Sequence, residues 1–214
     1  MGSYADKINI IDGQDKVEVK ENLAMFLQRV DINTYSGITV RMQQPTNNKV
    51  FTTKRFQITT DINSTSLHSS TLTSIVVPGS ILKDSPNSVP KRLSIIIYRN
   101  STFFLPQDKV VVQVSHLVVS ARFEGNKKFA NLKDPVKINF AHEVNDMAKP
   151  VCVFWENAKR PYDWSGDGCR YTGKEDGLLT CQCSHLTNFA MLLVSLDHYG
   201  KLSCNIEHFS SFLL

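Results

Sequence analysis

The C-terminal third of the sequence gathers four of the five cysteines into 32 residues, and this cluster constrains the fold more than any other feature. The four are Cys152, Cys169, Cys181 and Cys183. Such a density in a turn-rich segment is typical of disulfide-bonded proteins from oxidising compartments. Four cysteines allow three pairings, and their spacing alone does not choose among them.

Two potential N-glycosylation sites agree with an oxidising, extracellular location. Asn63-Ser64-Thr65 and Asn100-Ser101-Thr102 both match the acceptor pattern Asn-X-Ser/Thr. The fifth cysteine, Cys204, stands apart from the cluster. An odd thiol in such a protein suggests an intermolecular bond, a partner lost from this fragment, or a buried cysteine without a redox role.

From Gly37 onward the apolar residues recur with a period of two, which is the period of β-strands. Ile38, Val40 and Met42 alternate with polar residues in the first of these segments. Further β-branched and aromatic runs follow at 56–59, 72–77, 93–98, 110–123 and 136–140, with polar loops at 61–71 and 84–91. This spacing predicts a mainly β protein with an antiparallel β-sandwich.

One segment near the start has helical spacing instead. Asp15 can cap a helix that runs to about Val30. The apolar positions of this segment lie three and four residues apart, at Val19, Leu23, Phe26, Leu27 and Val30. The sequence therefore predicts a short N-terminal helix, and no other convincing helix.

Charge and hydropathy exclude several classes of function. The chain has 24 Lys and Arg against 20 Asp and Glu, and the basic residues are scattered, so nucleic-acid binding is not expected. No stretch approaches the ~20 consecutive apolar residues of a membrane-spanning helix. Residues 1–6 lack the basic end and apolar centre of a signal peptide, so we expect an internal fragment or a truncated product. No phosphate-binding glycine loop or other cofactor motif is present, and no cofactor is expected.

The cysteine cluster, taken with its neighbours, resembles the GPS motif that closes the GAIN domain of adhesion G-protein-coupled receptors; polycystin-type proteins carry a similar motif. The matching residues are Cys152-Val153-Phe154-Trp155, Trp164-Ser165, Cys169 and Cys181-Gln182-Cys183-Ser184-His185-Leu186-Thr187. Residues 135–142 also resemble the family's strand ahead of the motif. The resemblance covers residues 16–197 and is strongest from Val136 onward.

This resemblance implies a division of the chain and a disulfide pattern. Residues 1–35 would be a remnant of the helical GAIN subdomain, residues 36–197 the β-sandwich (GAIN subdomain B-like) with the motif at 148–197, and residues 198–214 a C-terminal tail. In the family the first cysteine pairs with the third and the second with the fourth, which implies Cys152 with Cys181 and Cys169 with Cys183. We further expect Trp155 and Trp164 to pack around these disulfides.

The resemblance also implies self-cleavage between Leu186 and Thr187. In the mechanism that these functional groups permit, His185 takes the proton of the Thr187 hydroxyl, which attacks the carbonyl carbon of Leu186. In a straight strand His185 and Thr187 would share a face but lie too far apart for a hydrogen bond, so we expect a kink at Leu186. Such a chain turns over no external substrate and is not an enzyme in the ordinary sense.

The segment after the cleavage bond is apolar on both faces, as in a central strand. The family resemblance implies that it is a tethered agonist of the seven-helix membrane domain of the parent receptor, and that this strand stays bound after cleavage. Its residues are Thr187, Asn188, Phe189, Ala190, Met191, Leu192, Leu193 and Val194.

Two alternatives stay open. The same fold could serve as a non-cleaving extracellular adhesion or structural module. A zinc-binding module would use Cys181, Cys183 and His185 with Cys152 or Cys169 as a fourth ligand. The two-residue spacing on a strand disfavours zinc, because side chains roughly 6.6 Å apart along a straight strand do not converge on one ion. We therefore expect no metal site.

Overall fold

The computed structural model describes residues 8, 10, 15–31, 33–44, 56–59, 70–83, 92–105, 117–124, 129–141, 148–156 and 163–195. In chain order, the elements are β1 (Lys16–Lys20), β2 (Leu23–Arg29), β3 (Gly37–Gln43), β4 (Phe56–Thr59), β5 (Thr71–Pro78), α2 (Ser80–Lys83), β6 (Arg92–Tyr98), β7 (Val118–Phe123), β8 (Val136–Ala141), β9 (Ala148–Glu156), β10 (Asp163–Ser165), β11 (Cys169–Glu175), β12 (Leu178–Cys183) and β13 (Asn188–Ser195). Within these residues, no helix has the length and apolar character that crossing a bilayer requires.

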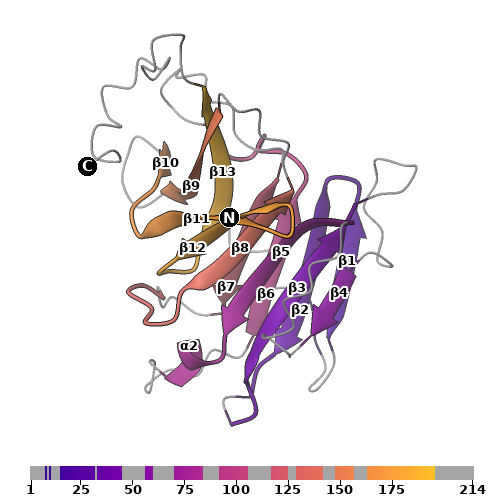
Figure 1. Ribbon diagram of the computed structural model, residues 1–214. Coiled ribbons are helices and arrows are strands. Elements are labelled where there is room, and N and C mark those ends of the chain that lie inside the picture. The colour runs from indigo at the N-terminus through magenta and orange to yellow at the C-terminus, as the bar shows by residue number, and fades with distance from the viewer. Residues whose placement is uncertain are drawn as a thin grey trace.

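The described strands form two antiparallel sheets that face each other (Figure 1). The first sheet has the strand order β1-β2-β6-β7-β13-β9-β10, and the second sheet has the order β11-β12-β8-β5-β3-β4. In Figure 1 the edge strands β1 and β4 lie on one side of the molecule, and β10 and β11 lie on the other. The predicted antiparallel β-sandwich is therefore confirmed.

The space between the sheets is filled by one apolar core. Inward-facing residues alternate along each strand, as Ile38, Val40 and Met42 do in β3, and all three are fully buried. Such alternation buries one face of each strand and leaves the other free for other contacts. The predicted strands within the described residues are confirmed. The predicted loop at 84–91 and residues 61–69 of the predicted loop at 61–71 lie outside the described residues, and Thr71 is already the first residue of β5.

The predicted helix from Asp15 to Val30 is wrong, because this segment is a hairpin of β1 and β2 joined at Glu21-Asn22. β2 also pairs with β6, so the segment belongs to the first sheet and is not a remnant of a helical subdomain. The apolar run in β2 misled the prediction because both faces of the strand are buried, and a short run of this kind fits a helix equally well.

The two faces of β2 have different partners. Phe26 points into the core between the sheets, while Met25 and Leu27 on the other face pack with Ile8 and Ile10. The strict alternation of β1, Lys16-Val17-Glu18-Val19-Lys20, followed by an Asn turn was the signal for a hairpin.

β13 lies in the interior of the first sheet, between β7 and β9. It pairs with β9 from Phe189 to Ser195 and with β7 at Asn188 and Phe189. The predicted central strand, buried on both sides, is thus confirmed. A strand in this position can leave the sheet only by breaking hydrogen bonds on both of its edges.

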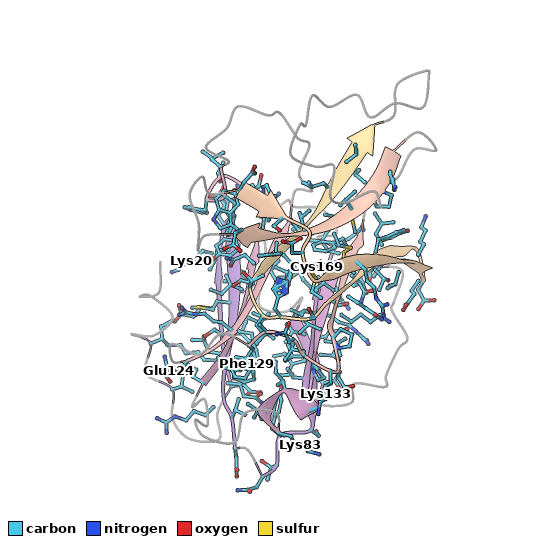
Figure 2. The ribbon with its side chains drawn as sticks, turned by 90° about the vertical axis from the view of Figure 1, so that its left-hand side faces the viewer. Lys20, Lys83, Glu124, Phe129, Lys133 and Cys169 are labelled. Atoms are coloured by element: carbon cyan, nitrogen blue, oxygen red, sulfur yellow. A yellow bond between two sulfur atoms is a disulfide. The ribbon has the colours of Figure 1, made fainter. Side chains whose placement is uncertain are left out.

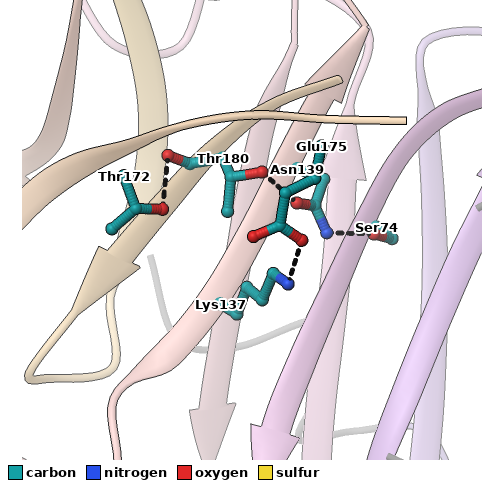
Figure 3. A network of polar contacts seen from close by, with 6 residues as sticks. All are labelled: Ser74, Lys137, Asn139, Thr172, Glu175 and Thr180. Carbon is teal, nitrogen blue, oxygen red and sulfur yellow. Dashed lines mark hydrogen bonds and ion pairs between the residues drawn. The ribbon is translucent and has the colours of Figure 1, made fainter. Parts of the chain in front are cut away.

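A network of buried polar groups joins three strands of the second sheet (Figure 3). The Thr180 hydroxyl donates to the side-chain oxygen of Asn139 at 2.8 Å, and the Asn139 amide donates to the Ser74 hydroxyl at 2.8 Å. The Thr73 hydroxyl donates to the backbone carbonyl of Asn139 at 2.7 Å. All four residues are almost completely buried, so their hydrogen bonds replace the water that each polar group lost on folding.

We expect the substitution Asn139→Ala to destabilise the fold by about 2 to 4 kcal/mol, because the buried hydroxyls of Thr180 and Ser74 would both lose a partner. The measurement is urea unfolding of the disulfide-bonded protein. The control is Gln182→Ala, which removes an exposed contact with Arg170 and should change stability by about 0.5 kcal/mol or less. Equal effects of the two substitutions would contradict the assigned role of the network.

Candidate functional site

The tripeptide His185-Leu186-Thr187 lies where the chain passes from one sheet to the other. β12 ends at Cys183 in the second sheet, and β13 begins at Asn188 in the first sheet. Facing sheets are about 10 Å apart, so residues 184–187 must turn out of one sheet and into the next. These four residues form a bend outside any strand, and the expected kink at Leu186 is confirmed.

Two disulfides flank this crossing, and they have the pairing that the family resemblance implies. Cys152 of β9 bonds to Cys181 of β12 with Cα atoms 5.8 Å apart, which links the two sheets. Cys169 of β11 bonds to Cys183, its direct neighbour on β12. The disulfides therefore fix the last strand before the crossing to the first sheet and to its own hairpin partner.

The zinc-binding alternative is wrong for this state of the protein. All four candidate sulfurs are consumed in disulfides, so none is a thiolate that could bind zinc. Nor does the described part of the chain hold any group of three or more His, Cys, Asp or Glu side chains that could bind a metal ion.

His185 is held between two aromatic rings. Its imidazole contacts Phe154 edge-to-face with ring centroids 4.3 Å apart, and it meets Phe189 in the same geometry at 5.8 Å. Both ring nitrogens are shielded from solvent and have no hydrogen-bond partner in the described part of the protein. Burial lowers the pKa of His185 below its usual value, and the nearby carboxylate of Glu156 opposes this shift. The ring is therefore neutral at pH 7.

The structure brings His185, Leu186 and Thr187 together in one half-buried bend, but it does not join the imidazole to the Thr187 hydroxyl by a hydrogen bond. A neutral imidazole can accept a proton. Hydrogen bonds between catalytic groups are often absent from a resting conformation and form only as the reaction proceeds. The arrangement can thus supply a base and a hydroxyl nucleophile once the ring or the hydroxyl reorients.

Backbone hydrogen bonds hold the start of the bend on both sides. The N–H of Ser184 donates to the carbonyl of Gly168 at 2.8 Å, and the carbonyl of Ser184 accepts from the N–H of Leu132 at 2.8 Å. Gly168 has a φ of 73°, and a Cβ there would lie 2.7 Å from the Ser184 hydroxyl oxygen. Only glycine fits this close approach without strain.

Two more backbone hydrogen bonds hold the rest of the bend. The N–H of Leu186 donates to the carbonyl of Phe129 at 3.0 Å, and the carbonyl of Thr187 accepts from the N–H of Ala121 in β7 at 3.0 Å. Figure 2 shows Phe129 between Glu124 and Lys133 in its view, below Cys169. The bend is therefore held by the turn before β11, the loop before β8, and β7.

The peptide group between Leu186 and Thr187 has no such support. Among the described residues, no backbone hydrogen bond is made by the carbonyl of Leu186 or by the N–H of Thr187. The groups on either side of this amide are fixed, whereas the amide itself is not. A peptide bond in this situation can be twisted, or its carbonyl attacked, without loss of a hydrogen bond.

Both faces of β13 are covered. Phe189, Met191 and Leu193 point into the core between the sheets, and Ala190 and Leu192 point outward into a second apolar cluster. Leu193 is 8% exposed, and the other four are 1% exposed or less. The strand that begins just after the bend is thus inaccessible to solvent along most of its length.

The expectation that Trp155 and Trp164 pack around the disulfides is wrong. Their rings contact each other at 5.2 Å, and both contact Phe104 at 5.8 Å. This group covers the outer face of β13, whereas Cys152 lies in the core on the opposite face of the first sheet. Side chains alternate along β9, so Cys152 and Trp155 point to opposite faces.

The remaining sites lie outside the bend. Asn100 is in the loop after β6 and is half-buried, and its side-chain oxygen accepts a hydrogen bond from the N–H of Thr102. Glycosylation there stays a prediction. Asn63, Cys204 and the tail at 198–214 lie outside the described residues.

Sequence reasoning missed the groups that hold the bend. The dipeptide Asp167-Gly168 is typical of a turn, and its glycine could have indicated a close approach of another segment to the backbone here. Phe129, Leu132 and Ala121 act through backbone groups, and backbone pairing between segments more than fifty residues apart leaves no mark in the local sequence.

Several known proteins are similar to this chain in sequence. The family model described as GPS: GAIN subdomain B matches residues 27–197, which is most of the chain. Human adhesion G-protein coupled receptor G5 is 26% identical over 210 residues, covering 89% of this chain and 39% of that protein. Human adhesion G protein-coupled receptor E2 is 32% identical over 128 residues, covering 59% of this chain and 15% of that protein. The chain thus spans less than two fifths of either relative.

A solved structure shares the fold. The full extracellular region of zebrafish Gpr126/Adgrg6 matches with a TM-score of 0.64 and 24% identity, over 83% of this chain and 23% of that one. The strands from β3 to β13, the two disulfides and the His-Leu-Thr bend all lie within the segment that the family model matches, whereas β1 and most of β2 precede it. This chain belongs to the GAIN subdomain B family, the domain that carries the GPS motif in adhesion G-protein-coupled receptors.

Proposed function

We propose that this chain is the extracellular autoproteolysis-inducing domain of an adhesion receptor, that it cleaves itself once between Leu186 and Thr187, and that it then retains the cut strand. The observation that carries this proposal is the bend at residues 184–187, where hydrogen bonds fix both flanks of the Leu186–Thr187 amide and leave that amide unsupported. A neutral histidine and a hydroxyl nucleophile stand in the same bend.

In the proposed mechanism, the His185 imidazole takes the proton of the Thr187 hydroxyl, and the hydroxyl oxygen attacks the carbonyl carbon of Leu186. The tetrahedral intermediate loses the Thr187 nitrogen, which receives the proton from the imidazolium and becomes an amine. Leu186 is then joined to Thr187 through an ester. Water hydrolyses this ester to the Leu186 carboxylate and the free Thr187 hydroxyl, so the chain is cut and the histidine is unchanged.

The ester formed by this acyl shift is higher in free energy than an unstrained amide. The fold therefore has to distort the peptide bond and so weaken its resonance stabilisation. Four hydrogen bonds and two disulfides around the bend provide rigid supports for such distortion. The edge contact with Phe154 keeps the imidazole from rotating freely, which favours its presentation to the hydroxyl.

The cut strand would remain in the sheet. Burial of Phe189, Met191 and Leu193 contributes on the order of 5 to 9 kcal/mol before the entropy of ordering is considered. Hydrogen bonds to β9 and β7 add to this retention. Neither disulfide crosses the cut, because all four cysteines precede Leu186.

We further propose that the segment from Thr187 to Val194 is a tethered agonist for the seven-helix domain of the parent receptor. Its burial on both faces in β13 is what such an agonist requires before activation, because a hidden strand cannot act. The names of the relatives place them among adhesion receptors, and the two disulfides fit an extracellular location.

One observation favours a second candidate, a non-cleaving extracellular module of the same fold. Neither ring nitrogen of His185 is hydrogen-bonded to the Thr187 hydroxyl, so the base and nucleophile are not engaged in this conformation. An intact chain with both disulfides would then act only as a rigid adhesive or structural unit.

The two candidates predict different masses. We expect the protein secreted from a eukaryotic cell to behave as one particle in native solution and to release a 28-residue fragment beginning at Thr187 on denaturation. The Thr187→Ala variant should stay in one piece, because it has no hydroxyl to attack Leu186. Thr172→Ala, a change of the same type at an exposed position of β11, serves as the control and should cleave normally.

An uncut wild-type chain would reject self-cleavage and leave the non-cleaving module. Release of the fragment from Thr187→Ala would reject Thr187 as the nucleophile and point to a contaminating protease. Loss of the fragment without denaturant would contradict retention of the cut strand.

The mechanism needs an unprotonated His185, and this can be tested through stability. Because burial lowers the pKa of His185 in the folded state, the unfolded chain binds a proton first as the pH falls. Above the pKa of about 6.5 that His185 has in the unfolded chain, neither state binds the proton and His185 does not change the stability. Below that pH, protonation of the unfolded chain progressively lowers the free energy of unfolding. We therefore expect the Thr187→Ala protein to lose more stability between pH 7 and pH 5 than the Thr187→Ala, His185→Gln protein.

Urea unfolding at the two pH values measures this difference. The contributions of the other histidines to the pH dependence cancel, because both proteins contain them. An equal or larger loss in the protein that lacks His185 would show that the buried imidazole does not resist protonation.

A further inference from the structure

The short loop before β8 makes two of the four hydrogen bonds that hold the bend. The carbonyl of Phe129 accepts from Leu186 at 3.0 Å, and the N–H of Leu132 donates to Ser184 at 2.8 Å. The loop therefore contacts the bend on the N-terminal side of the cleavage bond, at the residue before His185 and the residue after it. His185 is therefore flanked in the chain by the two residues that this loop holds.

The ends of this loop are anchored in the core. Phe129 is 7% exposed, and its ring packs against Phe123 with centroids 5.1 Å apart. Leu132 is partly buried against the main core, as is Leu186 on the other side of the hydrogen bonds. Phe129 and Leu132, the two loop residues that make hydrogen bonds to the bend, are thus also held in place by apolar contacts.

Between the two anchors, Asn131 has a φ of 56°, which is the left-handed conformation. Outside glycine this conformation is uncommon; asparagine tolerates it best, and β-branched residues essentially do not adopt it. The side chain of Asn131 is exposed, so it contributes no core packing. Its importance lies in the backbone turn, which directs the Phe129 carbonyl and the Leu132 N–H toward the same segment.

We propose that the loop 129–132, shaped by the left-handed backbone of Asn131, is a positioning element that sets the carbonyl of Leu186 in line for attack by the Thr187 hydroxyl. This inference rests on the proposed self-cleavage. Asn131 itself touches no reacting atom, and it acts through the hydrogen bonds of its neighbours to Ser184 and Leu186.

The reaction is sensitive to this placement for a geometric reason. The Leu186 N–H and the Leu186 carbonyl belong to adjacent peptide groups that share one Cα atom, so once the first group is fixed only the φ and ψ angles of Leu186 set the position of the second. A displacement of the attacked carbon by about 1 Å can lower the rate of such a step by about 100-fold.

The chain offers a matched control for the backbone effect. Asp176, in the turn between β11 and β12, is the other described residue outside glycine with a positive φ, at 48°, and its side chain is also exposed. No hydrogen bond among the described residues joins Asp176 to the bend. A β-branched substitution at either position imposes the same kind of conformational strain, but only Asn131 lies in the loop that holds the bend.

The experiment compares Asn131→Val, Asn131→Gly, Asp176→Val and the wild-type chain, each synthesised in a pulse-labelled secretory translation system. The cleaved fraction is followed during the chase on denaturing gels. Thermal unfolding is measured in parallel on the same substitutions in the uncut Thr187→Ala background, which reports stability separately from the rate of cleavage.

We expect Asn131→Val to slow cleavage by about 10- to 100-fold. Asn131→Gly should cleave at a rate close to that of the wild-type chain, because glycine adopts positive φ freely. Asp176→Val should also cleave at close to the wild-type rate, although both valine variants lower the unfolding midpoint by a similar few degrees, about 2 to 4 °C.

Three results would overturn the proposal in distinguishable ways. Cleavage of Asn131→Val at the wild-type rate would remove the positioning role and leave self-cleavage intact. Equal slowing by both valine variants would show that cleavage follows overall stability and not this loop. A wild-type chain that never cleaves would reject the proposed function and the positioning role together.

Discussion

The disulfide between Cys152 and Cys181 joins the two sheets beside the place where the chain crosses between them, and the rest of the site depends on this constraint. Two residues beyond Cys181 the chain leaves the second sheet, and it enters the first sheet beside β9, the strand that carries Cys152. A cross-link between facing strands limits how far the sheets can slide or separate. The bend at 184–187 therefore spans a gap of fixed width.

This constraint explains why an irregular bend and a buried strand occur next to each other. The chain has to leave a regular sheet to cross the core, so the amide between Leu186 and Thr187 lies outside any ladder of hydrogen bonds. The chain must then enter the interior of the first sheet, where β13 is paired on both edges and covered on both faces. One sharp crossing thus leaves this amide without a backbone hydrogen bond among the described residues and buries the strand that follows it.

The outer face of β13 has its own cover. Phe104, Trp155 and Trp164 pack over Ala190 and Leu192, so removal of the strand exposes apolar surface on both sides of the sheet. Withdrawal would break the β9 and β7 ladders and open two apolar clusters at once. Such a strand is held firmly by non-covalent contacts, as the proposed cleavage without separation requires.

The sequence was sufficient for those parts of the fold that leave a local pattern. Period-two alternation identified β3 and β4, and apolar or β-branched runs identified β5, β6 and β8. The apolar run after Thr187 identified a strand buried on both faces. The disulfide pairing followed from the resemblance to a family. The N-terminal hairpin was mistaken for a helix, because the run from Leu23 to Leu27 is buried on both faces and has no clear period.

The support of the bend could not be predicted from local sequence. Phe129 and Leu132 bind it through backbone atoms that every residue carries, and the signal at Asn131 is a backbone angle. The positions of Trp155 and Trp164 depend on strand alternation relative to Cys152, which is visible only once the bounds of β9 are known. Long-range pairing and the choice of face are decided by the whole sheet and not by neighbours along the chain.

The most direct test of the central claim is amide hydrogen exchange in the uncut Thr187→Ala protein. If the flanks of the cleavage bond are held and its own amide is not, the N–H groups of Ser184 and Leu186 should exchange slowly, while that of residue 187 exchanges at least about 100-fold faster, a difference of about 2.7 kcal/mol in opening free energy. Equal protection of residues 186 and 187 would show that the cleavage amide is as firmly bonded as its neighbours, and would contradict the proposed origin of its reactivity.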